Sequence, residues 1–197
     1  KCLFSSSEQI SILTQVADAL ANMHSVNMVH RDIKPGNVLL YGDYKVKVID
    51  LGLAKHFANT ISSGVSQSMK SNSRFQAKKA HVSVNKSVQI TVATCGTIMY
   101  KAPEVIAEEF LLDGEQWKKA DVYSFGIFMY ELAVGAMPYD AEHTDYQIQT
   151  KVLNNQRPII PKFVQPQLAK LISDCWKHDP QARPTMKQVF ERLSGMK

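Results

Sequence analysis

The fold of this 197-residue chain is decided by the stretch His30-Arg31-Asp32-Ile33-Lys34-Pro35-Gly36-Asn37. Its Pro35-Gly36 pair favours a loop, because proline cannot continue a helix and glycine accepts turn conformations. A helix precedes the loop: Ser5-Ser6-Ser7-Glu8-Gln9 contains two overlapping capping boxes. Apolar residues then follow at helical spacing: Leu13, Val16, Ala17, Leu20 and Met23. We therefore expect about five helical turns that end near Asn27 and lead into the loop.

A β-hairpin is predicted directly after the loop. Residues 37–41 and 45–50 are rich in β-branched and aromatic side chains, and the Gly-Asp pair between them is typical of a turn. In the second strand, valines and lysines alternate, so the valines share one face. Because a hairpin folds back on itself, we expect Asp32 and Asp50 to face a common cleft.

The polar residues of this unit suit phosphoryl transfer. Asp32 can accept a hydroxyl proton, and Lys34 can neutralise charge on the transferred phosphoryl group. Asn37 can help to hold a divalent metal through its carbonyl oxygen, and Asp50 is a second candidate ligand at a strand end. Hard oxygen donors of this kind favour Mg²⁺.

These residues resemble the protein kinase family. Residues 30–37 are similar to its catalytic loop, and Asp50-Leu51-Gly52 to its metal-binding triplet, with leucine where phenylalanine is usual. The resemblance implies ATP and Mg²⁺ as cofactors and protein substrates as partners. It also implies the following site residues: Asp32, Lys34 and Asn37 as catalytic, Lys34, Asn37, Leu39 and Asp50 as cofactor-binding, and Asn37 and Asp50 as metal ligands.

Three later motifs extend the resemblance along the chain. Ala102-Pro103-Glu104 is similar to the motif that closes the activation segment, here residues 50–104. Asp121 opens a motif that implies a central buried helix, and its carboxylate would hold the catalytic loop through backbone amides. Arg183-Pro184-Thr185 resembles the closing signature, in which Arg183 pairs with Glu104. Asp121 and the Arg183–Glu104 pair are structural in this interpretation.

Serine/threonine specificity follows from the same resemblance. Lys34, two positions after the proposed base, is the pattern of serine/threonine kinases. Thr97 points the same way, because the corresponding hydroxyl in the family bonds to the residues that match Asp32 and Lys34. The tail around Trp176 and Arg183 is similar to the tyrosine-kinase-like group, whose members mostly phosphorylate serine and threonine.

Arg31 suggests regulation by phosphorylation, because an arginine beside the proposed base can pair with an added phosphate. Thr91 and Thr94 are the candidate sites, and an upstream activating kinase is a possible partner. The segment also holds a basic, serine-rich insert at about residues 58–90, with no Asp or Glu between Leu51 and Pro103. This insert is a docking or phosphorylation arm or, as we favour, a tolerated surface insertion.

Composition excludes several classes of protein. The chain is 45% hydrophobic and 21% charged, as globular domains are. Its net charge of +5 resides in the basic insert, so we expect a solvated loop and no nucleic-acid partner. The longest apolar stretch, residues 122–137, is too short to span a membrane. Three cysteines without a C-x-x-C pair argue against disulfides and zinc, and indicate the cytoplasm, with the nucleus as an alternative.

The predicted fold class is mainly α with a small β-hairpin, a kinase-like C-terminal lobe over residues 1–197. Its helical subdomain spans 104–195, with helices expected at 104–109, 121–134, 166–177 and 185–193. Neither G-x-G-x-x-G nor Val-Ala-x-Lys occurs, and the chain lacks an initiator methionine, so we expect the N-terminal lobe to be absent. Two functions remain open: a partial domain of an active serine/threonine kinase, or a non-catalytic interaction or pseudokinase module.

Overall fold

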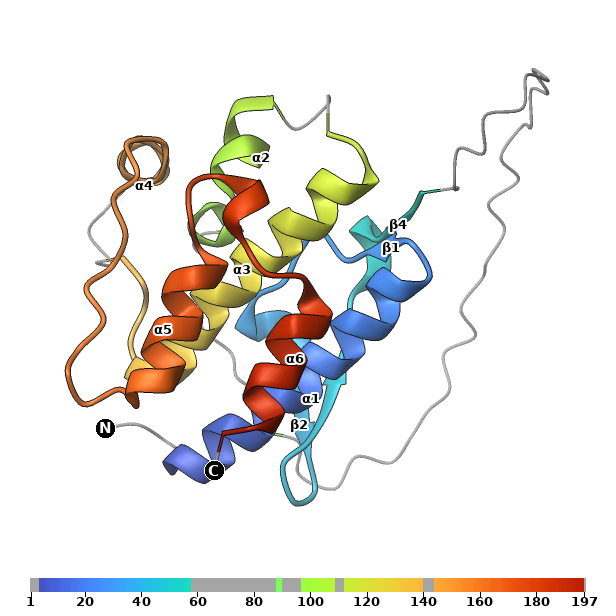
Figure 1. Ribbon diagram of the computed structural model, residues 1–197, viewed down its shortest axis with the longest axis vertical. Coiled ribbons are helices and arrows are strands. Elements are labelled where there is room, and N and C mark those ends of the chain that lie inside the picture. Colours follow the sequence, from blue (N-terminus) through green and yellow to red (C-terminus); the bar gives the residue numbers. More distant parts are fainter. Residues whose placement is uncertain (1–3, 58–87, 90–96, 109–111, 140–143, 197) are drawn as a thin grey trace.

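The computed structural model describes residues 4–57, 88–89, 97–108, 112–139 and 144–196 (Figure 1). Its first element is helix α1 (Ser6–Ser25). Ser5 caps it with a complete capping box, because the Glu8 carboxylate accepts the Ser5 backbone N–H at 2.7 Å and the Ser5 hydroxyl accepts the Glu8 N–H. Of the two predicted boxes, this one sets the start of the helix. Its core face is fully buried at Leu13, Val16, Ala17 and Leu20.

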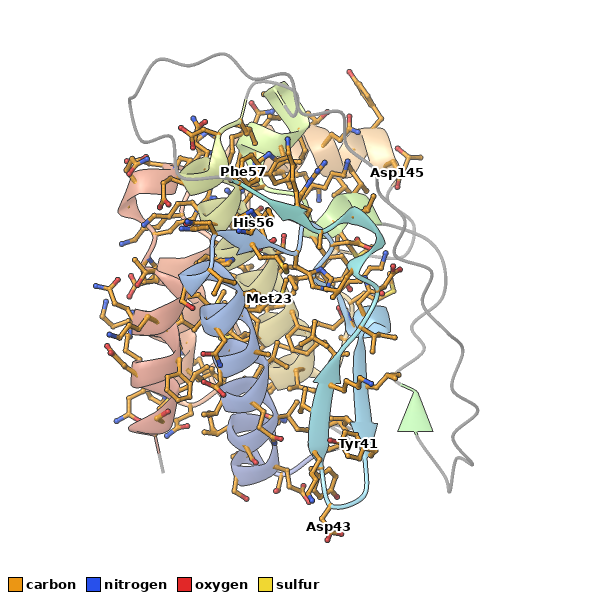
Figure 2. The ribbon with its side chains drawn as sticks, turned by 90° about the vertical axis from the view of Figure 1, so that its right-hand side faces the viewer. Met23, Tyr41, Asp43, His56, Phe57 and Asp145 are labelled. Atoms are coloured by element: carbon orange, nitrogen blue, oxygen red, sulfur yellow. The ribbon has the colours of Figure 1, made fainter. Side chains whose placement is uncertain are left out.

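The predicted hairpin is formed by β2 (Val38–Tyr41) and β3 (Lys45–Val48), which pair antiparallel from Val38 opposite Val48 to Tyr41 opposite Lys45. Both valines of β3 are half-buried and both lysines are exposed, as their alternation predicts. Figure 2 shows the turn of the hairpin, with Tyr41 and Asp43, at the opposite end of the molecule from His56 and Phe57.

The prediction of a single hairpin is wrong, because the described residues form two small sheets. β1 (Met28–Val29) pairs antiparallel with β4 (Lys55–His56), and β5 (Val88–Gln89) adds to the free edge of β2. These strands have two residues each, which is too short for a periodic pattern. They arise from backbone pairing between distant segments, and sequence periodicity carries no signal for such pairing.

The second half of the chain is helical. Its described residues form 3₁₀ turns at Thr97–Tyr100 and Pro180–Ala182 and five α-helices: α2 (Pro103–Glu108), α3 (Gly114–Val134), α4 (Asp145–Leu153), α5 (Pro166–Cys175) and α6 (Met186–Ser194). All four predicted helices are present. The sequence did not predict α4, and α3 begins earlier than expected, because Asp113 and Gln116 form a capping box before the apolar run.

Helix α3 is the centre of the core. Its middle part is buried on all sides, with Tyr123, Phe125 and Ile127 fully inaccessible. α1 packs along α6, and α5 along α3 (Figure 1). Asp121 and Trp176 are 1% and 6% exposed, so both belong to the core. Within the described part of the chain, no helix is long and apolar enough to cross a membrane.

Candidate active site

The carboxylate of Asp32 is the centre of a cluster of polar side chains in the predicted catalytic loop. It is 9% exposed, and its Oδ2 lies 2.7 Å from the Lys34 Nζ and accepts a hydrogen bond from the Asn37 Nδ2 at 2.8 Å. The same Asn37 amide also donates to the Asp32 carbonyl at 2.7 Å. The proposed base, cation and metal-binding amide therefore form one cluster, in which two donors fix the orientation of the acid.

The carboxylate of Asp121 anchors this loop to helix α3 through backbone hydrogen bonds. Its Oδ2 accepts the His30 backbone N–H and its Oδ1 the Arg31 backbone N–H, both at 2.8 Å. The His24 Nε2 lies 2.9 Å from the same carboxylate, so α1 and α3 are joined at this point. An almost fully buried carboxylate is stabilised only when it accepts several hydrogen bonds, and Asp121 satisfies this condition.

Asp50 is tied to the catalytic loop through its neighbour Ile49. The Ile49 N–H donates to the Asn37 carbonyl at 2.9 Å, and the Ile49 carbonyl lies 3.1 Å from the His30 Nε2. Asp50 itself has φ 62°, and its side chain accepts the Gly52 N–H at 3.3 Å. Asp32 and Asp50 thus lie on segments that are hydrogen-bonded to each other, and that both face a common cleft stays a prediction.

The residues proposed to hold Mg²⁺ fit that ion by the chemistry of their donors. The Asn37 Nδ2 donates to Asp32, which leaves the side-chain Oδ1 as the atom of Asn37 that could bind a metal, and the Asp50 carboxylate is exposed. Both are hard oxygen donors. Across the described ranges, His, Cys, Asp and Glu side chains form no cluster of three or more that could hold a metal.

Of the remaining predicted site residues, the structure describes some and not others. Leu39 is half-buried on β2, opposite Lys47 of β3 and Gln89 of β5. Thr97 starts a 3₁₀ turn, but its side chain lies outside the described residues, as do Thr91, Thr94 and the insert up to residue 87.

The structural pair Arg183 and Glu104 is bidentate. Arg183 is 2% exposed, and its two terminal nitrogens lie 2.6 and 2.8 Å from the Glu104 carboxylate oxygens. It also donates to the backbone carbonyls of Lys119, Lys177 and His178. A buried guanidinium is stable when its donors are paired in this way.

Sequence reasoning missed two side-chain contacts that involve helix α3. The Tyr100 hydroxyl donates a short hydrogen bond to the Glu131 carboxylate, and burial raises the pKa of both groups. The Arg31 guanidinium lies over the Trp117 ring, 4.4 Å from its centroid. The partners in each pair are far apart in sequence and share no short motif.

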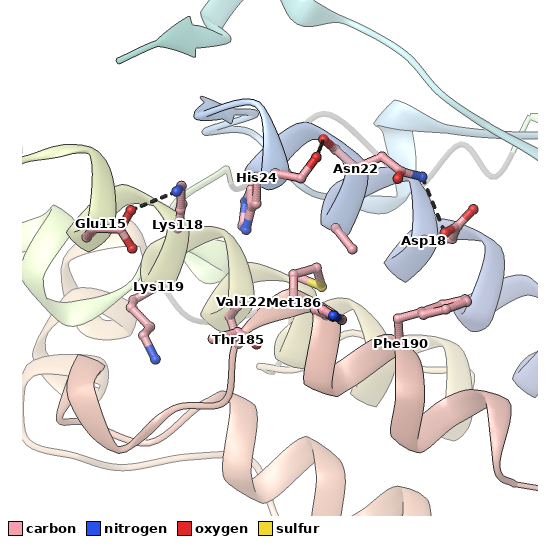
Figure 3. Close-up of a pocket in the computed structure, with 13 residues that line it drawn as sticks. Asp18, Asn22, His24, Glu115, Lys118, Lys119, Val122, Thr185, Met186 and Phe190 are labelled. Carbon is pink, nitrogen blue, oxygen red and sulfur yellow. Dashed lines mark hydrogen bonds and ion pairs between the residues drawn. The ribbon is translucent and has the colours of Figure 1, made fainter. Parts of the chain in front are cut away.

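A cavity of about 500 Å³, with His24 among its lining residues, lies between α1, α3 and α6 (Figure 3). Val122, Met186 and Phe190 form its apolar wall, and Lys118 and Lys119 lie at its edge. Lys118 is paired with Glu115 at 2.7 Å, and burial lowers the pKa of Lys119, whose Nζ donates to the Arg183 carbonyl. The cavity is separate from the Asp32 cluster.

Comparison with known proteins agrees with this geometry. The family model of the protein kinase domain matches residues 1–193, so the chain belongs to the protein kinase family. It is 33% identical over 188 residues to a protein of Acanthamoeba polyphaga mimivirus named for a serine/threonine-protein kinase/receptor, R831. It is 29% identical to the light-sensor protein kinase of Ceratodon purpureus, and 29% identical to the serine/threonine-protein kinase STY46 of Arabidopsis thaliana.

These three alignments cover 94%, 98% and 92% of this chain. They cover only 9%, 14% and 26% of the respective relatives, which are much longer proteins.

The family match also corrects the predicted fold class. A kinase-like C-terminal lobe with the N-terminal lobe absent is not supported, because the family model covers residues 1–193, nearly the whole chain. The described elements are helices with a small β-sheet region, not helices with one hairpin. The prediction failed because it rested on two missing short motifs, whereas the family match depends on the pattern of the whole chain.

Proposed function

We propose that the chain acts in a protein serine/threonine kinase of the tyrosine-kinase-like group, which transfers the γ-phosphoryl group of ATP to serine or threonine of protein substrates. The observation that carries this proposal is the Asp32 cluster. An acid that is 2.7 Å from a lysine ammonium and hydrogen-bonded to an asparagine has the parts that phosphoryl transfer requires.

Asp32 accepts the proton of the substrate hydroxyl while the hydroxyl oxygen forms a bond to the γ-phosphorus. The bond between this phosphorus and the bridging oxygen breaks, and ADP leaves with that oxygen. Lys34 stabilises the negative charge on the transferred group from its position beside Asp32. Asn37 and Asp50 would hold Mg²⁺, which neutralises phosphate charge when bound.

Serine/threonine specificity is supported by Lys34 and by the names of the relatives. We extend the proposal to a cytoplasmic location, supported by Cys175, which is a free and buried thiol.

The test is phosphate transfer by the full-length protein to a mixed peptide library, followed by identification of the phosphorylated residue. We expect phosphoserine and phosphothreonine, and no product from an Asp32→Asn variant. Phosphotyrosine alone would contradict the specificity. No labelling by the wild type would indicate a non-catalytic interaction module instead, and equal labelling by the wild type and Asp32→Asn would contradict the role of Asp32.

A further inference from the structure

Arg31, the residue before the proposed base, has an aromatic partner inside the fold. Its guanidinium carbon lies 4.4 Å from the centroid of the Trp117 ring, within the range of a cation–π interaction. Trp117 is 5% exposed, so the ring is part of the core and its face is fixed in position. Arginine stacks well on aromatic faces because its guanidinium is planar and weakly hydrated.

Helix α3 contacts both the main chain and the side chain of Arg31. The Asp121 carboxylate accepts the backbone N–H of Arg31 at 2.8 Å, while Trp117 contacts its side chain. Trp117 and Asp121 are four positions apart, so they lie one turn from each other on the same face of α3. One helix face therefore fixes both the main chain and the side chain of Arg31.

Arg31 needs such support because its backbone is left-handed, with φ 71°. This conformation is sterically unfavourable for a residue with a side chain, so it persists only where its surroundings hold it. The strained residue directly precedes Asp32, and a change of φ or ψ at Arg31 would move the Asp32 carboxylate away from Lys34 and Asn37. The orientation of the proposed base thus depends on how firmly Arg31 is held.

We propose that Trp117 is a positioning residue for the catalytic loop: it holds Arg31, and through it Asp32, without an added phosphate on the activation segment. A phosphate is the other partner that a guanidinium prefers, but it is present only after modification. The Trp117 ring, in contrast, is present whether or not the protein is phosphorylated. This inference rests on the proposed function, and it replaces the expectation that Arg31 requires phosphorylation of Thr91 or Thr94.

The experiment measures kcat and KM of the full-length protein after phosphatase treatment, for the wild type, Trp117→Phe and Trp117→Leu. We expect the wild type to keep its kcat within about twofold. Trp117→Leu keeps an apolar side chain but loses the ring, and its kcat should fall about tenfold with little change in the KM for ATP. Trp117→Phe keeps a π face and should retain most of the activity.

Three results would overturn the inference: a large loss of wild-type kcat on dephosphorylation, an unchanged kcat in Trp117→Leu, or equal losses in the leucine and phenylalanine variants. Should Trp117→Leu fail to fold, Arg31→Met tests the same contact from the other side, with the same expected fall in kcat.

The failure of this inference can be distinguished from the failure of the proposed function. If Asp32→Asn is as active as the wild type, the proposed function fails. The contact is then tested by a double-mutant cycle of Arg31→Met and Trp117→Leu on the free energy of unfolding, in which zero coupling would refute it. If Asp32→Asn is inactive and Trp117→Leu is normal, only the inference fails.

Discussion

Arg183 and Glu104 form a bidentate ion pair across 79 residues of sequence, with nitrogen–oxygen distances of 2.6 and 2.8 Å. The pair joins the end of the predicted activation segment to the turn before α6. Arg183 also donates hydrogen bonds to three backbone carbonyls beside this pair. The pair therefore fixes where α2 lies on the helical core, and with it the far end of the segment that begins at Asp50.

Removing this arginine is expected to destabilise the protein strongly. Arg183→Met leaves the Glu104 carboxylate and three carbonyls without their donor, so the free energy of unfolding should fall by about 3–5 kcal/mol. Urea denaturation followed by circular dichroism measures the change.

Arg192→Met is the matched control, because Arg192 pairs with Asp174 at 3.0 Å but is 35% exposed. This pair is partly exposed and Asp174 keeps Lys170 and Lys177 as partners, so its loss should cost about 1 kcal/mol or less. Similar losses in the two variants would contradict the structural role of the buried pair.

Much of the fold was predictable where the signal is local. The capping box at Ser5, the loop at Pro35-Gly36 and the alternation in β3 all depend on neighbouring residues, and each appears as expected. The Asp32 cluster was predictable for the same reason, because its members lie within six positions in one loop.

The rest required the three-dimensional structure. The contact of Arg31 with Trp117 and that of Tyr100 with Glu131 join residues on different elements, and neither has a periodic or motif signal. The pairing of β1 with β4 likewise depends on backbone groups of distant segments. The side chain of Thr97, which the resemblance links to Asp32, lies outside the described residues and stays a prediction.

Asp121→Asn should weaken the catalytic loop. The carboxylate accepts the backbone N–H groups of His30 and Arg31 with separate oxygens. Asparagine can offer only one oxygen, so one N–H would face an amide donor, and stability should fall by about 1–3 kcal/mol. The kcat should fall as well, because Asp32 follows these two residues. Normal stability and kcat in this variant would contradict the anchoring role, as measured by urea titration and a phosphate-transfer assay.

Glu131 is expected to make stability depend on pH. Burial raises its pKa above the ordinary value of 4.5, so the folded state binds this proton more tightly than the unfolded state. The resulting stabilisation is complete below pH 4.5 and is lost as the pH rises through the pKa of the folded state. Glu131→Gln keeps an acceptor for the Tyr100 hydroxyl but cannot ionise.

The measurement is the difference in free energy of unfolding between Glu131→Gln and the wild type, from pH 4 to pH 8. We expect the free energy of unfolding of the variant to increase relative to that of the wild type as the pH rises. Comparing the two proteins cancels the other titrating groups, such as Asp174, whose pKa is lowered by Lys177 and Arg192 although burial opposes the shift. A difference that does not change with pH would show that Glu131 does not titrate in this range.

Asn37→Ala should raise the Mg²⁺ requirement. The variant removes one proposed oxygen ligand and also the amide that orients Asp32, so half-maximal activity should need at least ~10-fold more Mg²⁺. A titration of activity against Mg²⁺ tests this, after complete loss of activity in EDTA has been shown. Asn22→Ala is the control, since Asn22 is exposed on α1 and belongs to no proposed site, and the Mg²⁺ requirement of this variant should not change. An unchanged requirement in Asn37→Ala would exclude Asn37 as a ligand.

The measurement that tests the central claim most directly is the kcat of Asp32→Asn in the full-length protein. Asparagine keeps the shape of the side chain but cannot accept the hydroxyl proton as a base. We predict a fall of at least ~100-fold, or about 2.7 kcal/mol in activation free energy, with the free energy of unfolding little changed. A kcat equal to that of the wild type would contradict the assignment of this chain as the catalytic part of a kinase.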